Sequence, residues 1–229
     1  MVQKRASAAD KGVAAASPAT EAGKAKRPLY DAPKRGRPRA YDPEDALKRA
    51  RDVFWVKGYA GTTLDDIVEA TGMNRPSLYA AFGDKEAIYL AALKMQGELL
   101  VGAVAAAVKL DMKLKPFLDL FFDRCIESYL AGANGPRGCF LVGTALTESL
   151  MRDDVGAAVR EAFERVDALL EGRFRQAKKA GELPKAADPA ALAQFVSSVM
   201  HELSMYARAG SKRTALEQRV AMARKLMGA

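Results

Sequence analysis

Apolar residues recur at spacings of three and four along most of the chain between residues 42 and 227. This spacing places them on one face of an α-helix, and runs of β-branched residues are scarce. The first such face begins after Asp42 and Pro43, which are typical of a helix start, and ends near Gly58, which favours a helix stop. The pattern therefore predicts an all-α protein.

Two short helices are predicted to follow the first one. Thr62 and Thr63 lie at capping distance before acidic residues, so we expect a second helix that ends near Gly72. Asn74 is then placed to cap a third helix that runs to Phe82. Two short helices joined by a tight turn that contains a glycine form the helix-turn-helix pattern.

The remaining residues predict a larger helical body. The periodicity and its glycine and proline breaks predict helices over residues 85–110, 117–131, 139–151, 155–180, 189–209 and 211–227. Together with the first three helices, these segments predict about nine helices in total.

Positive charge is concentrated at the amino end of the chain. Residues 1–40 contain ten Lys and Arg and three acidic residues, so they carry +7 of the total net charge of +8. Residues 1–36 also contain few large apolar groups, and such a segment cannot bury enough surface to offset its ordering entropy. We therefore expect residues 1–36 to form a disordered basic tail, which would attract polyanions, chiefly nucleic acid or an anionic membrane.

Several function classes are disfavoured by what the sequence lacks. No run of about 18 apolar residues is free of charges, and no apolar core follows the first basic residues, so we expect neither a membrane span nor a secretory signal. An organelle transit peptide stays compatible with the composition. Two cysteines and one histidine cannot form an ordinary zinc site, and neither a phosphate loop nor a nucleophile elbow is found. We expect no metal, no cofactor, no enzymatic activity and a reducing, cytoplasmic location.

A family resemblance is carried by five segments near the amino end: Gly58-Tyr59, Thr62-Thr63-Leu64-x-x-Ile67, Ala70-x-Gly72, Ser77-Leu78-Tyr79-x-x-Phe82 and Lys85-Glu86. At this spacing, about residues 37–95 resemble the DNA-binding domain of TetR-family regulators. The resemblance implies an all-α homodimer with a helix-turn-helix head over residues 37–84 and an effector-binding and dimerisation body over residues 85–229. It also implies a bacterial transcriptional regulator, usually a repressor that a small-molecule, oxidant or electrophile effector releases from a palindromic operator.

The match assigns residues to double-stranded operator DNA. They are Arg37, Arg39, Thr62, Thr63, Asn74, Arg75, Pro76, Ser77, Tyr79 and Lys85. The guanidinium of Arg75 suits the O6 and N7 atoms of guanine, whereas Tyr79 and Lys85 are expected to grip phosphate. Thr62 and Thr63 lie at a helix amino end, where free N–H groups favour phosphate.

The basic arm and the third helix leave two questions open. Arg37 and Arg39 flank Pro38 and suit a narrow minor groove, with a solvated linker as the alternative. Ala80 and Ala81 stand where many family members have a second aromatic residue or a histidine, so no operator sequence can be transferred. A nonspecific DNA-organising protein is the rival function, and a discrete footprint would distinguish the two.

The body is expected to hold a cavity and a dimer surface. The aromatic candidates for the effector site are Phe121, Phe122, Tyr129 and Phe163, with a purely structural core as the alternative. Two apolar stripes are candidates for a four-helix dimer interface, or for an intramolecular core. They are Leu192, Phe195, Val196, Val199 and Leu203, and then Leu216, Val220, Ala223 and Leu226.

Cys139 is the candidate for a reactive group. It follows a loop rich in glycine and proline, lies beside Arg137 and stands at a predicted helix start. A helix amino end and a nearby cation both lower a thiol pKa, which favours an oxidant or electrophile sensor, while a structural cysteine is the alternative. Trp55 and His201 are expected to pack in the core.

Overall fold

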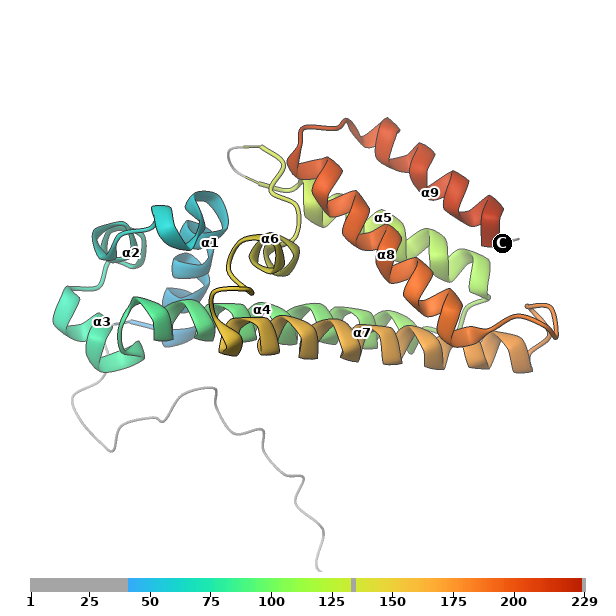
Figure 1. The fold of residues 1–229 in the computed structure, drawn as a ribbon, viewed down its shortest axis with the longest axis horizontal. Helices are drawn as coiled ribbons and strands as arrows, with labels where there is room; N and C mark the ends of the chain where they lie inside the picture. Colours follow the sequence, from blue (N-terminus) through green and yellow to red (C-terminus); the bar gives the residue numbers. More distant parts are fainter. Residues whose placement is uncertain (1–40, 133–134, 228–229) are drawn as a thin grey trace, which may run out of the picture. The chain divides into compact units, whose positions relative to one another are not determined.

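The computed structural model describes residues 41–132 and 135–227 of the 229 residues in the chain. Within these ranges the chain forms nine α-helices and no strand, as Figure 1 shows, which confirms the predicted all-α fold. The predicted tail over residues 1–36, and with it Arg37 and Arg39, lies outside the described residues. The domain limits at residues 37 and 85 stay a prediction.

The first three helices form a compact head. They are α1 (Pro43–Gly61), α2 (Leu64–Thr71) and α3 (Arg75–Phe82). The carboxylate of Asp42 accepts a hydrogen bond from the backbone N–H of Glu44 at 2.9 Å, so the predicted helix start is confirmed. Gly58 interrupts the helical path of α1 with φ 70°, a conformation that glycine adopts without strain, and one further turn carries the helix to Gly61.

The two turns of the head are built from caps that the sequence predicts. Thr63 and Asp66 form a capping box: the Thr63 N–H donates to the Asp66 carboxylate at 2.8 Å, and the Asp66 N–H donates to the Thr63 hydroxyl at 3.2 Å. Gly72 ends α2 in the left-handed conformation, and the Asn74 side chain then accepts from the Ser77 N–H at 2.9 Å. These local bonds fix the angle between α2 and α3.

A small apolar core closes the head. Ile67 of α2 and Leu78 of α3 are fully buried against Phe54 of α1 and Ile88 of the next helix. The ring of Phe54 meets the ring of Tyr89 edge-on, with centroids 4.9 Å apart. The outer sides of α2 and α3 are thereby left to solvent.

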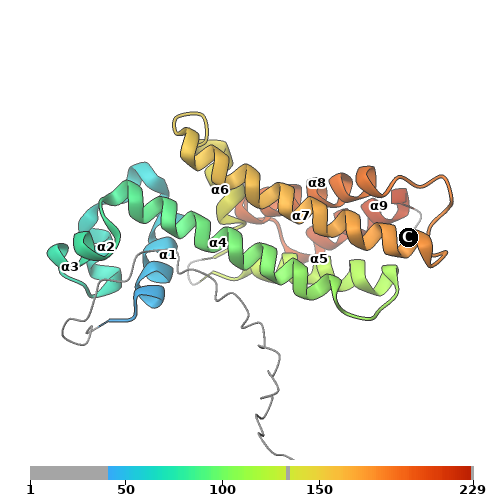
Figure 2. The ribbon, with the colours of Figure 1, turned by 90° about the horizontal axis from the view of Figure 1, so that it is seen from below.

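Six further helices form the body. They are α4 (Lys85–Val108), α5 (Leu114–Leu130), α6 (Phe140–Thr147), α7 (Asp153–Lys179), α8 (Pro189–Arg208) and α9 (Arg213–Met227). The helix α4 leaves the head and packs along α7, as both views show (Figures 1 and 2). Close approach of these two helices depends on Gly97, because a Cβ atom there would lie 3.3 Å from the Cβ of Ala162. α8 packs against α5, α7 and α9.

The helix α4 is long and apolar enough, by length and composition alone, to cross a membrane. In the structure it packs against α1, α3, α5, α6 and α7, so we interpret it as a helix of the protein's own core. Several of its apolar residues, among them Leu99 and Ala103, border a cavity that is described below.

Candidate DNA-binding surface and ligand cavities

The third helix presents a polar edge to solvent. The side chain of Tyr79 is 47% exposed, and Pro76 and Ala80 are exposed beside it, whereas Leu78 on the opposite side is 1% exposed. The buried Leu78 therefore anchors the inner side of α3, and Tyr79 lies on its outer, exposed side. The predicted outward orientation of this edge is present in the structure.

Arg75 is held at the start of α3 by an acidic residue of α2. Its Nη2 atom donates to both carboxylate oxygens of Asp65, at 2.7 and 2.8 Å, and its Nε atom donates to one of them at 3.2 Å. The hydrogen bond to Asp65 raises the pKa of Arg75. Within the described residues Nη1 has no partner, so part of the guanidinium stays available for a base edge.

Thr62 is misassigned by the sequence pattern. Its side chain is 1% exposed, and its hydroxyl donates to the carbonyl of Gly58 at 2.6 Å. It therefore closes the bend in α1 and cannot reach a phosphate, which corrects the expected DNA contact. The neighbouring Thr63 is exposed and caps α2, and its environment is compatible with the expected contact.

Lys85 performs a task that the sequence did not indicate. Its Nζ atom donates to the carbonyls of Tyr59 and Thr62, at 3.1 and 3.0 Å, and lies 4.2 Å from the centroid of the Tyr59 ring. These contacts fasten α4 to the end of α1. An ammonium group has three donors, so one remains for a phosphate contact.

A cavity of about 520 Å³ opens along α4 and α5 in the body. Leu99 and Ala103 of α4 border it, together with Leu110 just beyond that helix, and Phe121 and Tyr129 border it from α5. Two of the four predicted aromatic residues are therefore at a cavity wall. Its volume and its largely apolar lining are typical of small-molecule sites.

Phe122 and Phe163 lie elsewhere. Phe122 is fully buried in the core, and the ring of Phe163 lies against His201 with centroids 4.3 Å apart. Burial lowers the pKa of His201, and its Nε2 atom has no partner in the part of the chain that the structure describes. His201 is half-buried and lacks one hydrogen-bond partner, so it packs beside the core as expected only in part.

Cys125 is a cavity residue that the sequence analysis missed. It borders the 520 Å³ cavity between Phe121 and Tyr129, four residues from each. Helical spacing alone would have grouped these three side chains on one face. Burial raises the pKa of the Cys125 thiol to about 12.

Cys139 lies where the sequence predicts, at the amino end of α6, but its chemistry differs from the prediction. The thiol is buried, and this burial raises its pKa although the backbone N–H groups of Val142 and Leu141 act in the opposite direction. The backbone N–H of Cys139 donates to the hydroxyl of Ser204 at 2.7 Å. The expected lowering of the thiol pKa is therefore wrong, because removal from water outweighs the helix end.

Arg137, which the sequence places beside the Cys139 thiol, contacts Trp55 in the structure. Its guanidinium lies 4.0 Å from the centroid of the Trp55 ring, and its carbonyl accepts a hydrogen bond from the Trp55 indole at 3.0 Å. Arg208 Nη1 donates to the carbonyls of both Trp55 and Arg137, at 3.2 and 3.1 Å. Trp55 packs as expected, and the three side chains join the head to the body.

An exposed recognition edge on a helix-turn-helix head, carried by an all-helical body, defines a DNA-binding regulator. The model described as "Bacterial regulatory proteins, tetR family" matches residues 46–92, and the model described as "Tetracyclin repressor-like, C-terminal domain" matches residues 118–223. The chain belongs to the TetR family of bacterial regulatory proteins.

The relatives are regulators. The transcriptional repressor ComR of Escherichia coli is 29% identical over 184 residues, which are 80% of this chain and 88% of that protein. The transcriptional regulator AcuR of Cereibacter sphaeroides is 30% identical over 71% of this chain and 76% of that protein. A cysteine mutant of the regulator CifR, solved with 26-base-pair operator DNA, is 31% identical with a TM-score of 0.73, over 82% of this chain and 97% of that one. The chain is accordingly a regulator and not an enzyme.

Proposed function

We propose that this protein is a dimeric, cytoplasmic repressor that reads a palindromic operator with α3 and is released when a small molecule occupies the body. The observation that carries the proposal is the exposed Arg75–Tyr79 edge, held in place by caps and by Asp65. We assign DNA binding to residues 37–84, and effector binding and dimerisation to residues 85–229.

The DNA contacts follow from the geometry of α3. The Arg75 guanidinium is assigned to a guanine, and Tyr79 to the adjacent backbone. Ser77 and Asn74 lie at the amino end of α3, where backbone N–H groups favour phosphate. Thr63 and the third donor of Lys85 supply further backbone contacts, with Pro76 beside them, and Arg37 and Arg39 are assigned to the minor groove. ComR is named a repressor, and the CifR structure contains operator DNA, which supports the assignment.

Dimerisation is assigned to the exposed apolar residues of α8 and α9. Most of each predicted stripe is buried within the subunit, so the alternative of an intramolecular core describes that part. The apolar side chains that remain exposed on these helices are Met205, Tyr206, Met222 and Leu226. A two-fold pairing of this face would present two heads to half-sites about 34–36 Å apart.

Effector binding is assigned to the 520 Å³ cavity between α4 and α5. The raised pKa values of Cys125 and Cys139 keep both thiols protonated, and the thiol is a poor nucleophile. We assign the cavity to a small-molecule effector held without a covalent bond, with an oxidant or electrophile as the alternative effector.

Footprinting and binding titrations test the proposal. We expect protection of a discrete palindrome, and we expect Arg75→Ala to weaken operator binding by roughly 5- to 150-fold while binding to random DNA changes little. Arg175→Ala is the matched control, because Arg175 is an exposed arginine that is also paired with an acid, Glu171, on the remote helix α7. Equal losses on operator and random DNA would overturn the role of Arg75, and continuous coverage would favour a DNA-organising protein.

A further inference from the structure

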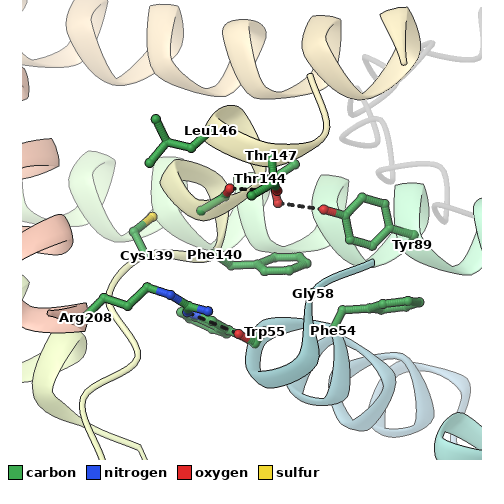
Figure 3. Close-up of a pocket in the computed structure, with 11 residues that line it drawn as sticks. Phe54, Trp55, Gly58, Tyr89, Cys139, Phe140, Thr144, Leu146, Thr147 and Arg208 are labelled. Carbon is green, nitrogen blue, oxygen red and sulfur yellow. Dashed lines mark hydrogen bonds between the residues drawn. The ribbon is translucent and has the colours of Figure 1, made fainter. Parts of the chain in front are cut away.

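A second cavity, of about 160 Å³, lies where the head meets the body (Figure 3). Trp55 of α1, Tyr89 of α4, Phe140 of α6 and Arg208 of α8 are among the residues that line it. None of its lining residues also lines the 520 Å³ cavity, so the two spaces are separate sites.

The hydroxyl groups in this cavity are already paired with each other or with the backbone. The Tyr89 and Thr144 hydroxyls share a hydrogen bond of 2.9 Å, and the Thr147 hydroxyl donates to the carbonyl of Gly143 at 3.1 Å (Figure 3). The rest of the wall is largely aromatic and aliphatic. A guest must therefore be mainly hydrocarbon.

Arg208 is the charged residue that lines the cavity, and it is exposed, so its unpaired guanidinium atoms are reached from solvent. Its Nη1 atom donates to the carbonyls of Trp55 and Arg137, but its Nε and Nη2 atoms have no partner among the residues that the structure describes. These two atoms form the side of the guanidinium that binds a carboxylate with two parallel hydrogen bonds. No acidic residue lines the cavity, so no internal carboxylate competes for this position.

We propose that this junction cavity binds a short-chain monocarboxylate, with the carboxylate on Arg208 and the hydrocarbon chain against Phe140 and Trp55. A cavity of this volume is close to the one of about 150 Å³ that admits benzene, so the guest has roughly three to six carbon atoms. The aromatic wall selects against inorganic anions, which carry no apolar surface to bury. The site is distinct from the effector cavity proposed above.

Trp55 supplies a site-specific signal, because it is the only tryptophan in the chain and it lies in the cavity wall. The full-length protein is titrated with butyrate and hexanoate while tryptophan fluorescence is recorded. Butyramide is the neutral control, and sulfate at equal ionic strength is the anion control. We expect a saturable change with the carboxylates, at least about tenfold weaker binding of butyramide, and no saturable change with sulfate.

Two variants locate the response. A Cβ atom at Gly143 would meet nothing within 4 Å, so Gly143→Leu fills the cavity without a backbone clash and leaves Arg208 in place. Gly172→Leu is the matched control, because a Cβ atom at Gly172 also meets nothing within 4 Å and this residue lies on α7, away from the cavity. Arg208→Gln removes the charge. We expect Gly143→Leu and Arg208→Gln to abolish the carboxylate response and Gly172→Leu to retain it, with helical content by circular dichroism showing that each is folded.

Absence of a saturable response in the unmodified protein would overturn the proposal. So would an unchanged response in Gly143→Leu, or equal binding of butyramide and butyrate. Because the titration contains no DNA, its result does not depend on operator binding. A failure here is therefore distinguishable from a failure of the proposed repressor function.

Discussion

The DNA-binding surface of the head and the ligand cavities are positioned by different kinds of contact. In the head, the functional edge of α3 is exposed, and neighbouring residues fix it through the Thr63–Asp66 box, the Asn74 cap and the Asp65 carboxylate. The candidate ligand sites, in contrast, are cavities: the larger one is bordered mainly by α4 and α5, with Met200 of α8, and the smaller one by residues of α1, α4, α6 and α8. Local chemistry thus determines the DNA-binding surface, and long-range packing determines the ligand sites.

The largest expected effect comes from removing Leu78, the buried side chain that packs α3 against the head, because this should destabilise the head and not the body. Leu78→Ala deletes a fully buried side chain, and we expect a loss of about 2–5 kcal/mol in the stability of the head, with loss of operator binding. Amide hydrogen exchange should then rise in α1 to α3 and stay unchanged in α7 and α8. Leu150→Ala, at a side chain that is 97% exposed, is the control and should change stability by less than about 0.5 kcal/mol. Equal loosening of the body would show that the two regions do not unfold separately.

The two thiols of the body, in contrast, lie in surroundings that disfavour the thiolate: Cys139 is buried, and Cys125 is half-buried in a cavity wall. Burial raises the pKa of both thiols, to about 12 for Cys125, so the thiolate fraction at neutral pH is far below that of an exposed cysteine. We expect both to react with a thiol reagent more than about tenfold more slowly than a model peptide thiol, and to react at the ordinary rate after denaturation. A native Cys139 that reacts faster than the model thiol would restore the sensor hypothesis.

A substitution at Asp65 tests whether this carboxylate positions Arg75 on the exposed side of α3. Asp65→Asn weakens the ion pair with Arg75 and removes a negative charge from the DNA-facing side. We expect affinity for random DNA to rise and the ratio of operator to random binding to fall several-fold, because the guanidinium is less well placed. Asp45→Asn, which breaks an exposed ion pair with Arg49 on α1, is the control. An unchanged ratio would show that Asp65 does not position Arg75.

The smallest expected effect concerns the capping box. The hydrogen bonds from Lys57 and from Thr63 lower the pKa of Asp66 to about 2, below its ordinary value of 3.8. The charged form is therefore favoured in the folded state, so its contribution is complete above about pH 4 and is lost as the pH falls towards 2. We expect Asp66→Asn to lower Tm slightly at pH 7, and this difference to disappear in the acid range. A difference in Tm that is independent of pH would mean that the carboxylate charge is not involved.

The sequence predicted what depends on neighbouring residues. The starts of α1 and α3 and the outward position of Tyr79 each follow from a few adjacent residues, and the structure has them. At Gly58, where the sequence predicts a helix end, the structure has a bend, and α1 continues to Gly61. Thr62 was misassigned because either of two adjacent threonines could cap α2, and only the bend in α1 decides which one is buried.

The body could not be predicted to the same depth. A helix start and a nearby arginine are local features of Cys139, but the burial that sets its pKa includes packing near Ser204 of α8, which is remote in sequence. Similarly, helical spacing cannot tell that Phe163 faces His201 while Phe121 faces a cavity. These differences depend on how the long helices of the body pack against one another, which the local sequence does not specify.

Tyr129 contacts both the larger cavity and the segment that leads to the head. Its ring borders the larger cavity, while its backbone carbonyl accepts hydrogen bonds from the N–H groups of Arg137 and Gly138, at 3.0 and 3.1 Å. The carbonyl of Arg137 in turn accepts the indole N–H of Trp55. The backbone of residues 137–138 therefore connects the wall of the larger cavity to Trp55 of α1 through hydrogen bonds alone.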